Sequence, residues 1–377
     1  MLRKLSLLLV MVLFALTVAP VFAQEATTGS EQVFLPLVTG GGSAVTVAEE
    51  EDDPIGEDLT DSLDVTAAGW HTGALFVATN AVDEVRGNEV VMYKRADDGT
   101  LTLVGYYPTG GQGSGPGPRF RADGLGSANS VVLSKNNKWL FVVNGKSNSL
   151  SVFRVHEYGL ELTDVVASGG EFPNSITVRR NRVYVMNSGG DGNLTGFTLR
   201  GNGTLEPIPN STRELDGNQS NPPDALFNHA TISFTPDGKF LVVSIKDGRA
   251  IEGSTGPGRI LTFRVRRGVP SATAVVTTVD NRGPFGFDFD DHGNLLVAEF
   301  VGGPELTGAA GSYRINHDGT LTEITVGVGN GQIDTCWLIT NGRYAYGSNF
   351  GTDNISSYTV GEDGSLTLLN PTAATTV

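Results

Sequence analysis

A single histidine stands where it could help to hydrolyse an ester. Of the five histidines, only His229 enters an apolar, strand-like run from a long connection, because three others lie in short turns and one precedes the first such run. A neutral imidazole can accept a proton from an attacking water molecule near pH 7. His229 is therefore a candidate catalytic base, and a hydrogen-bonded structural histidine is the alternative interpretation.

Opening an ester also requires positive charge or hydrogen-bond donors near the carbonyl oxygen, because this oxygen becomes anionic. Candidates in or next to long connections are Arg119, Arg121, Lys246 and Arg282. Any one of them alone is more typical of a solvated side chain. We therefore expect them to bind substrate only if they converge near His229.

Two acidic residues, Glu299 and Asp334, lie at the ends of strand-like runs and are further candidates for the site. Glu299 ends a strand-like run that recurs along the chain. Its counterparts in the other five repeats are Asn80, Asn144, Asn187, Ser244 and Asn349. A carboxylate at an amide position could act as a base or orient His229, and a hydrogen bond that caps the loop is the alternative. Asp334 enters a strand-like run as His229 does and is a parallel candidate, and Asn144 and Asn187 are further candidates for binding substrate.

Several other chemistries are excluded by the motifs. The chain contains no Gly-x-Ser-x-Gly elbow, and the glycine-rich segment 110–117 lacks the lysine and the following helix of a phosphate-binding loop. The single Cys336 excludes an intramolecular disulfide framework and a multi-cysteine zinc site. We expect Cys336 to be a buried apolar residue within its apolar run.

The formal charge of −15 is concentrated near the N-terminus. Residues 24–70 contain eleven acidic residues and no lysine or arginine, whereas residues 71–377 contain 30 acidic and 24 basic residues. The acidic part is too poor in apolar residues to bury a core, so we interpret it as a solvated linker. Without a basic stripe in the sequence, we expect no nucleic-acid partner.

The first 23 residues have the pattern of a signal peptide. Arg3 and Lys4 precede an apolar run, residues 5–19, and the small residues Val21 and Ala23 precede Gln24. We expect a secreted, periplasmic or cell-envelope protein with no membrane span after cleavage. An uncleaved membrane anchor is the alternative, because the apolar run would nearly span a bilayer.

Repetition along the rest of the chain indicates the fold. A short β-rich run recurs six times, at residues 75–80, 140–144, 183–187, 240–244, 295–299 and 344–349. The second repeat divides most clearly into four strands, which we predict at residues 129–134, 139–144, 149–155 and 161–168. Units of several short strands that recur at a regular spacing along the chain are typical of a β-propeller. We therefore predict an all-β propeller of four-stranded blades, with six modules in residues 71–377.

The turns predict where the two rims of the propeller lie. Asn-Gly and Asp-Gly pairs, which favour tight hairpins, recur between the first and second strands and between the third and fourth strands of the modules. Because the strands alternate in direction, these turns share one rim. The opposite rim carries the long connections, residues 108–127, 210–228 and 245–257. Long loops on a rigid scaffold often carry function, and tolerated insertions are the alternative.

With these repeats, residues 71–377 resemble the propeller lactonase family, which includes propeller-type 6-phosphogluconolactonases and carboxymuconate cyclases. The resemblance rests on residues 228–243 and 130–144 and on the aromatic lines at residues 151–155 and 357–360. The family implies seven blades. The seventh is either missing here or supplied in part by residues 33–38 and 43–47.

The family resemblance also implies features of the site. It implies that His229 faces a central funnel. Because some propeller lactonases bind calcium through Glu, Asn and Asp residues, it allows a calcium site as a minority alternative to a protein without cofactor. The ligands would then be Glu299, Asn144, Asn187 and Asp334.

The function that follows is an expectation about an exported protein. A phosphorylated lactone of central metabolism is made in the cytosol, so we expect a small polar, unphosphorylated sugar-type lactone to be bound on the long-loop rim, with its hydrolysis as the candidate reaction. A non-catalytic propeller that binds a glycan or a protein, and a structural module of the envelope, are the alternatives. We expect the protein to be a monomer.

Overall fold

The computed structural model describes residues 73–117, 124–246, 257–279, 282–301 and 307–375. All of them lie in one compact unit, Phe34–Val377. The predicted signal peptide, the acidic linker, the strands proposed at residues 33–38 and 43–47, and the candidates Arg119 and Arg121 lie outside the described residues.

The described residues form six antiparallel sheets, which we number 1 to 6 along the chain. Sheet 1 contains β1 (Ala74–Ala78), β2 (Glu89–Arg95) and β3 (Leu101–Pro108). Sheet 2 contains β4 (Val131–Leu133), β5 (Trp139–Asn144), β6 (Ser149–His156) and β7 (Gly159–Ala167). Sheet 3 contains β8 (Pro173–Arg179), β9 (Arg182–Asn187), β10 (Asn193–Leu199) and β11 (Leu205–Pro207), and β12 (Arg213–Glu214) also pairs with β10.

The other three sheets follow the same order. Sheet 4 contains β13 (His229–Phe234), β14 (Phe240–Ile245), β15 (Gly258–Arg266) and β16 (Val269–Pro270), and β17 (Val275–Val279) also pairs with β15. Sheet 5 contains β18 (Arg282–Phe289), β19 (Leu295–Val301), β20 (Thr307–Ile315) and β21 (Leu321–Ile333). Sheet 6 contains β22 (Thr335–Thr340), β23 (Tyr344–Asn349), β24 (Asn354–Val360) and β25 (Leu366–Thr375).

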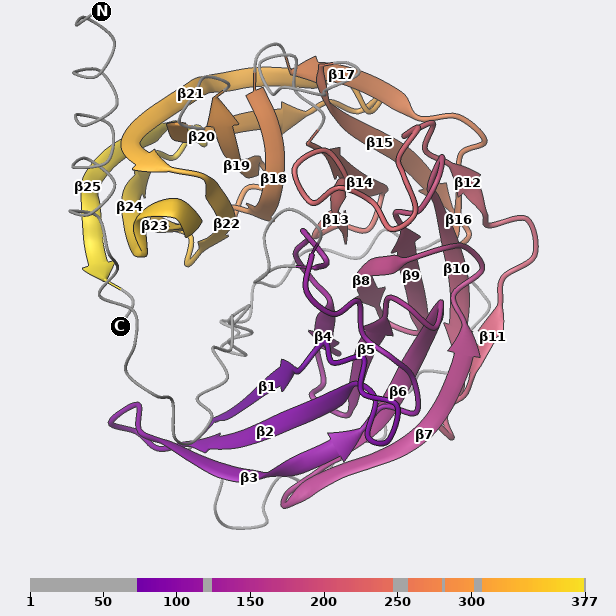
Figure 1. Cartoon of the computed structure of the whole chain (residues 1–377). Helices are drawn as coiled ribbons and strands as arrows, with labels where there is room; N and C mark the ends of the chain where they lie inside the picture. The colour runs from indigo at the N-terminus through magenta and orange to yellow at the C-terminus, as the bar shows by residue number, and fades with distance from the viewer. Residues whose placement is uncertain (1–72, 118–123, 247–256, 280–281, 302–306, 376–377) are drawn as a thin grey trace, which may run out of the picture. The chain divides into compact units, whose positions relative to one another are not determined.

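These sheets confirm the predicted modules. Each is a meander in chain order, and neighbouring sheets pack against each other, as β5 packs on β8 and β18 on β22. Figure 1 shows the sheets as successive blades with β4, β8, β13, β18 and β22 innermost. Sheet 1 has three strands in the described residues, and β1 occupies the position of the second strand of the other blades.

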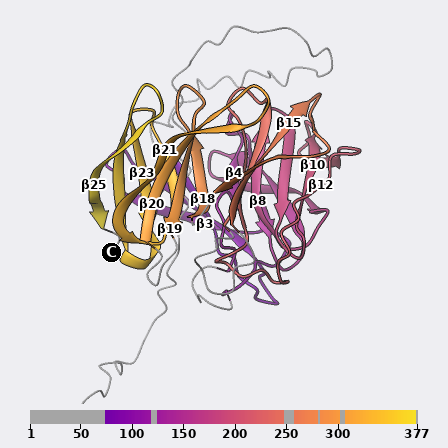
Figure 2. The ribbon, with the colours of Figure 1, turned by 90° about the horizontal axis from the view of Figure 1, so that it is seen from above.

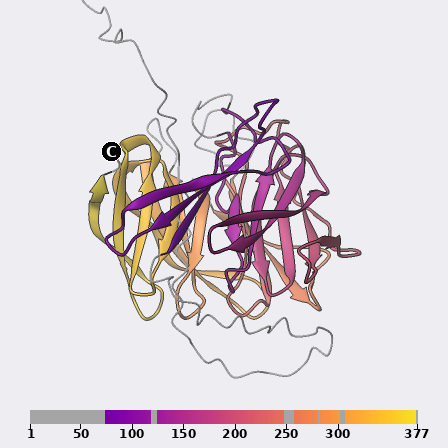
Figure 3. The same cartoon turned by 90° about the horizontal axis from the view of Figure 1, so that it is seen from below.

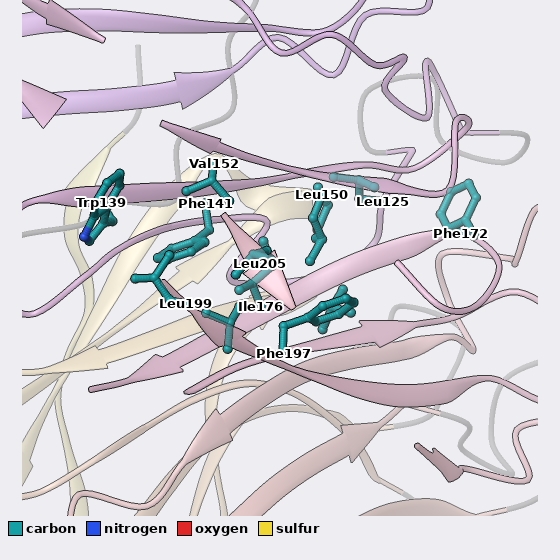
Figure 4. Packing of buried hydrophobic residues seen from close by; sticks show 13 residues of the cluster. Leu125, Trp139, Phe141, Leu150, Val152, Phe172, Ile176, Phe197, Leu199 and Leu205 are labelled. Atoms are coloured by element: carbon teal, nitrogen blue, oxygen red, sulfur yellow. The ribbon is translucent and has the colours of Figure 1, made fainter. Parts of the chain in front are cut away.

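Hydrophobic cores lie between neighbouring blades. Phe141 and Leu150 of sheet 2 pack with Ile176 and Phe197 of sheet 3 (Figure 4). On the same strand as Phe141, Leu140 faces the core shared with sheet 1, because side chains alternate along a strand. Burying each such side chain contributes about 1.5–3 kcal/mol. A blade that lies between two others therefore has two apolar faces, each buried by the neighbouring blade.

The two rims differ as the turn residues predict. The hairpin rim carries the tight turns, in which glycines such as Gly238 (φ +73°) and Gly364 (φ +86°) adopt the left-handed conformation. The opposite rim, which we call the loop rim, carries the longer connections between sheets and between their second and third strands. Figures 2 and 3 show the strands running between these rims. In the described part of the chain, no helix is long and apolar enough to cross a membrane.

Irregularities in the innermost strands turn one residue of each toward the axis. The pairing register shifts at Asn174 in β8, Ala230 in β13, Phe285 in β18 and Cys336 in β22. Ala230, Phe285 and Cys336 pack together although they come from three sheets. These β-bulges therefore gather side chains from separate blades at one place on the axis.

The chain segment that precedes β4, residues 125–129, crosses this axial region. The Ala128 amide donates to Ala230 O at 2.9 Å, and Ser127 Oγ donates to Asn174 O at 2.7 Å. Ser127 O in turn accepts a hydrogen bond from Trp337 Nε1 at 3.1 Å. The segment thereby ties three inner strands together beneath the loop rim.

Candidate functional site

A pocket opens where the inner strands reach the loop rim. It is lined by Ala225, Leu226, Lys246, Phe285, Phe300, Asp334, Cys336 and Phe350. The pocket encloses about 340 Å³ of empty space, solvent at its mouth included. Its enclosed part holds only about one water molecule. A ligand would therefore insert one small polar group, such as a carbonyl, rather than a whole sugar ring.

Three of the lining residues occupy the same structural position in different blades. Each follows the second-strand residue that pairs with the innermost-strand residue just before the register shift. Lys246 follows Ile245, the partner of His229, Phe300 follows Glu299, the partner of Pro284, and Phe350 follows Asn349, the partner of Thr335. This position points toward the axis in sheets 4, 5 and 6. Lys246 supplies the charged group among these three, and the two phenylalanines keep its surroundings apolar.

Lys246 is buried with a defined geometry. Its Nζ donates to Gly126 O at 2.6 Å and to Ala225 O. The ammonium also lies 3.9 Å from the centre of the Phe285 ring, a cation–π contact. Two carbonyl dipoles and an aromatic face thus hold a positive charge at the wall of the pocket, which offsets part of the cost of removing it from water.

Asp334 supplies a carboxylate to the same pocket. It forms the one-residue connection between β21 and β22 and adopts φ +56°, a left-handed conformation that aspartate tolerates better than most residues. Its carbonyl accepts the Phe350 amide at 2.9 Å. Cys336 Sγ lies 3.5 Å from Asp334 Oδ1. The pocket therefore combines a cation, a carboxylate and a thiol within aromatic walls.

Glu299 and Arg282 meet in a different place. Glu299 is fully buried on the face of sheet 5 that packs against sheet 4. Arg282 Nη1 donates to Glu299 Oε2 at 2.9 Å, and Tyr313 OH donates to Glu299 Oε1 at 2.8 Å. Arg282 Nη2 also donates to Glu323 at 2.6 Å. Burial raises the pKa of the Glu299 carboxyl, and the positive charge of Arg282 opposes this shift.

Two of the five residues that the sequence repeats align with Glu299 do not share its orientation in the structure. Asn144, Asn187 and Glu299 all face the preceding blade. In sheet 4 the residue with this orientation is Ile245, which pairs with His229, and not Ser244, whose Oγ donates to Phe285 O of sheet 5. In sheet 1 it is Thr79 and not Asn80, by the same alternation of side chains. The sequence alignment was wrong by one residue in these two modules, and a one-residue slip exchanges the two faces of a strand.

The asparagines at this position join neighbouring parts of the blades. Asn144 Oδ1 accepts from Asn88 Nδ2 at 3.0 Å and Thr109 Oγ1 at 2.7 Å, and its Nδ2 donates to Ser151 Oγ at 2.7 Å. Asn187 Nδ2 donates to Asn193 Oδ1 at 2.7 Å. Both asparagines are fully buried in these networks. Their described contacts are structural, and their binding of substrate stays a prediction.

The residues named for a calcium site do not converge. Asn144 and Asn187 lie in separate hydrogen-bond networks, Glu299 binds Arg282 and Tyr313, and Asp334 lines the axial pocket. Within the described ranges, no three His, Cys, Asp or Glu side chains gather as metal ligands would. These four residues therefore do not fit a shared calcium ion, and we derive no chemistry through one.

His229 begins β13 on the loop rim, as predicted, but its imidazole is fully buried beside sheet 3. Its Nδ1 lies 3.2 Å from Ser188 Oγ, and Nε2 has no hydrogen-bond partner among the described residues. Burial, with the nearby charge of Arg259, lowers the pKa of His229 to about 3. The imidazole is therefore neutral at physiological pH, and it is not one of the residues that line the axial pocket.

Two glycines on loop-rim connections leave room for this imidazole. A Cβ on Gly192 or Gly217 would overlap the ring of His229. We expect Gly217→Ala to destabilise the fold by about 1–3 kcal/mol, because the added methyl group overpacks a site that is already filled. Urea unfolding followed by fluorescence measures this change. Gly329→Ala is the matched control, because no atom lies within 4 Å of its added Cβ. Equal stabilities of the two variants would contradict the close packing.

The structure thus brings together some of the predicted residues and separates others. Lys246 and Asp334 line one pocket, Arg282 pairs with Glu299 at the interface of sheets 4 and 5, and His229 lies between sheets 3 and 4. The sequence analysis missed the phenylalanines and assigned Cys336 only to the core. Their common signal is position: each lies at the loop-rim end of a first or second strand.

The six antiparallel blades of the described residues, with an axial pocket on the loop rim, define a β-propeller. Residues 87–220 match the model of a family described as "Lactonase, 7-bladed beta-propeller". The resemblance to propeller lactonases that the sequence predicts is thereby confirmed. An uncharacterized protein of Staphylococcus saprophyticus is 30% identical over 100 residues, which cover 25% of this chain and 29% of that relative. The chain thus spans less than a third of this relative's length.

Solved structures agree on the fold. A Bacteroides uniformis protein provisionally described as a 6-phosphogluconolactonase is 19% identical, covers 79% of this chain and 81% of its own, and has a TM-score of 0.58. A Lactobacillus plantarum protein is 15% identical with the same coverages and TM-score. Kuenenia stuttgartiensis hydrazine synthase is 13% identical, covers 76% of this chain and 73% of its own, and has a TM-score of 0.52. One fold thus carries unrelated functions.

Proposed function

We propose that this chain binds a small lactone at the mouth of the axial pocket on the loop rim, with the lactone carbonyl inserted, and hydrolyses it. The observation that carries the proposal is that Lys246 and Asp334, which come from different blades, line the same pocket. A base and a cation that line one small space are the groups that ester hydrolysis needs. The similarity of residues 87–220 to propeller lactonases supports the choice of a cyclic ester.

The proposed mechanism assigns the two charged groups to successive steps. Asp334 accepts a proton from a water molecule while the water oxygen bonds to the lactone carbonyl carbon. The carbonyl oxygen becomes anionic beside the Lys246 ammonium, which stabilises it. The ring C–O bond then breaks, and the leaving oxygen takes the proton back from Asp334. The product is the open hydroxy acid, and the enzyme returns to its initial protonation state.

His229 has a supporting part in this proposal. Its neutral imidazole is buried against the loop-rim connections at Gly192 and Gly217, which precede the wall residues Ala225 and Leu226 in the chain. Asp334 takes the role of base because it lines the pocket. Glu299 and Arg282 join the strands of sheet 5 to one another and thereby support Phe285 and Phe300 of the same sheet.

We further propose that the substrate is an unphosphorylated, sugar-type lactone met outside the cell. Among the described residues that line the pocket, Lys246 is the one basic side chain, and Asp334 would repel a phosphate group. Export is proposed from the charged, apolar and small-residue pattern of residues 1–23, which lie outside the described residues.

The experiment is an assay of the purified chain on a panel of lactones, with phosphorylated and unphosphorylated forms of the same ring. We expect turnover above the uncatalysed rate for an unphosphorylated member and little for its phosphorylated form. Calorimetry on the same panel measures binding separately. Binding without turnover would favour the non-catalytic role, and neither binding nor turnover on any member would contradict the proposal.

A further inference from the structure

Basic residues gather on the hairpin rim, opposite the proposed catalytic pocket. They come from the tight turns of sheets 3 and 4, and we call them the basic rim patch. The patch consists of Arg179, Arg180, Arg182, Lys239, Arg264, Arg266 and Arg267. They belong to the β8–β9, β13–β14 and β15–β16 turns and the strand ends that flank them. The patch therefore depends on the fold and is not a run in the sequence.

Contacts between the turns make the patch continuous. Arg179 Nη2 donates to Asp237 O at 3.0 Å, and the Lys239 carbonyl accepts the Val265 amide at 2.8 Å. Tyr184 OH donates to Gly268 O at 2.6 Å, and Gly268 packs against Arg182. The three turns of two blades thus form one surface.

The positive charge of this surface is largely uncompensated. Arg180, Lys239, Arg266 and Arg267 are exposed. The three turns contain one carboxylate, Asp237, which lies 3.4 Å from Lys239. Burial and the like charge of Arg180 lower the pKa of Arg179. On the neighbouring blade, the turn that contains Asp318 packs on β15 through Thr262 and Gly319 and marks the edge of the patch.

A strongly acidic segment of the same chain has matching charge. It carries nine acidic residues and no basic one between positions 49 and 64. They are Glu49, Glu50, Glu51, Asp52, Asp53, Glu57, Asp58, Asp61 and Asp64. This segment lies outside the described residues and ends nine residues before Gly73.

The chain also enters the described part on the correct rim. β1 begins at Ala74 beside Lys94, close to the β2–β3 turn, and therefore starts from the hairpin rim. An extended chain spans about 3.3–3.6 Å per residue, so the 15 residues from Asp58 to Gly73 can reach about 50 Å. The acidic segment therefore approaches from the same rim as the patch, with about 50 Å of chain available to span the distance.

We propose that the acidic segment, residues 49–64, docks on the basic rim patch of its own chain. The interaction is electrostatic, so it weakens at high salt. It leaves the loop rim and its pocket uncovered and holds the N-terminal part of the chain on the opposite face. It is independent of whether the pocket is catalytic.

Zero-length coupling with a carbodiimide tests this docking, because it joins lysine amines to carboxylates that touch them. In the full chain at low salt, we expect Lys239 to couple to residues 49–64, with a yield at least about threefold above that of Lys135. Lys135 is a strict control, because it is exposed in the corresponding turn of sheet 2 and lies closer to the segment along the chain. Tethering alone would favour Lys135, whereas docking favours Lys239.

Two variants separate the patch from general surface charge. The first is a triple variant that combines Arg180→Gln, Arg266→Gln and Arg267→Gln. We expect it to lose the preference of the segment for Lys239 and to retain the fold, because all three side chains are exposed. The matched control replaces Arg95, Arg314 and Arg343, which are exposed elsewhere on the hairpin-rim side, and keeps the preference. Equal coupling of Lys239 and Lys135 would overturn the proposal. So would cross-links that form only between different chains, which a mixture of isotopically labelled and unlabelled protein reveals. Failure of the segment to couple while an added sulfated oligosaccharide binds the patch would also overturn it.

Discussion

Asp334→Asn is expected to lower kcat/KM for the lactone substrate by about 10²–10⁴-fold, the range that general-base catalysis contributes. Asparagine keeps the shape of the side chain and tolerates the left-handed backbone at this position (φ +56°), so the fold is retained. It cannot accept the proton of the attacking water. KM should change little, because the carboxylate acts mainly in the transition state.

Lys246→Met is expected to lower kcat/KM by about 10²–10³-fold, because the oxyanion loses its nearest positive charge. This variant also frees the Gly126 and Ala225 carbonyls, so its stability is measured in parallel.

Asp353→Asn is the matched control for Asp334→Asn. It removes an exposed carboxylate whose backbone is also left-handed (φ 51°). Asp353 follows the 3₁₀ turn Phe350–Thr352 and is not one of the residues that line the pocket. If Asp334→Asn retained more than half of the activity, as Asp353→Asn is expected to, the assignment of the base would be wrong.

Much of the fold is predictable from the sequence because the repeats carry redundant signals. In sheet 2, the predicted strands at residues 139–144 and 149–155 match Trp139–Asn144 and Ser149–His156 to within one residue. Alternating apolar residues agree with tight turns at positive φ in each described module, where the turn residue is glycine in five sheets and Asn137 in sheet 2. Six such modules support one interpretation even where a single module is ambiguous.

The site is only partly predictable, because the bulges that build it leave no periodic signal. Lys246 and Asp334 were found from their places at strand ends on the loop rim. The bulges at Phe285 and Cys336 rotate these residues toward the axis, and the pattern of apolar residues does not reveal that rotation. The same limit explains the one-residue slip at Ser244, since both Ser244 and Ile245 fit a buried strand.

The distribution of charge on the surface is also only partly predictable from the sequence. The sequence contains no basic stripe, yet seven basic residues converge on the hairpin rim because three separate turns pack together. Net charge along the chain describes the acidic segment well, since its residues are contiguous. It does not describe a patch that only the blade packing creates.

The stability of the fold is expected to fall by about 3 kcal/mol between pH 6.5 and pH 4 through His229 alone. The pKa of this imidazole is about 3 in the folded chain, below the ordinary value of 6.5, because burial disfavours the charged form. The unfolded chain therefore binds a proton at a pH at which the folded chain does not. This contribution is complete above pH 6.5 and is lost progressively as the pH falls toward 3.

Comparison of variants isolates this contribution from that of buried carboxyls such as Glu299 and Asp288, whose raised pKa values act in the opposite direction. His229→Asn keeps a polar group near Ser188 but cannot take up a proton in this range, so its stability should fall less steeply than that of the natural chain. His292→Asn, which removes an exposed histidine from a hairpin turn, should follow the natural chain. Urea unfolding at half-unit steps of pH measures all three curves. Parallel curves for the natural chain and His229→Asn would show that His229 is protonated in the folded state, and the closed packing of its imidazole against Gly192 and Gly217 would then be incorrect.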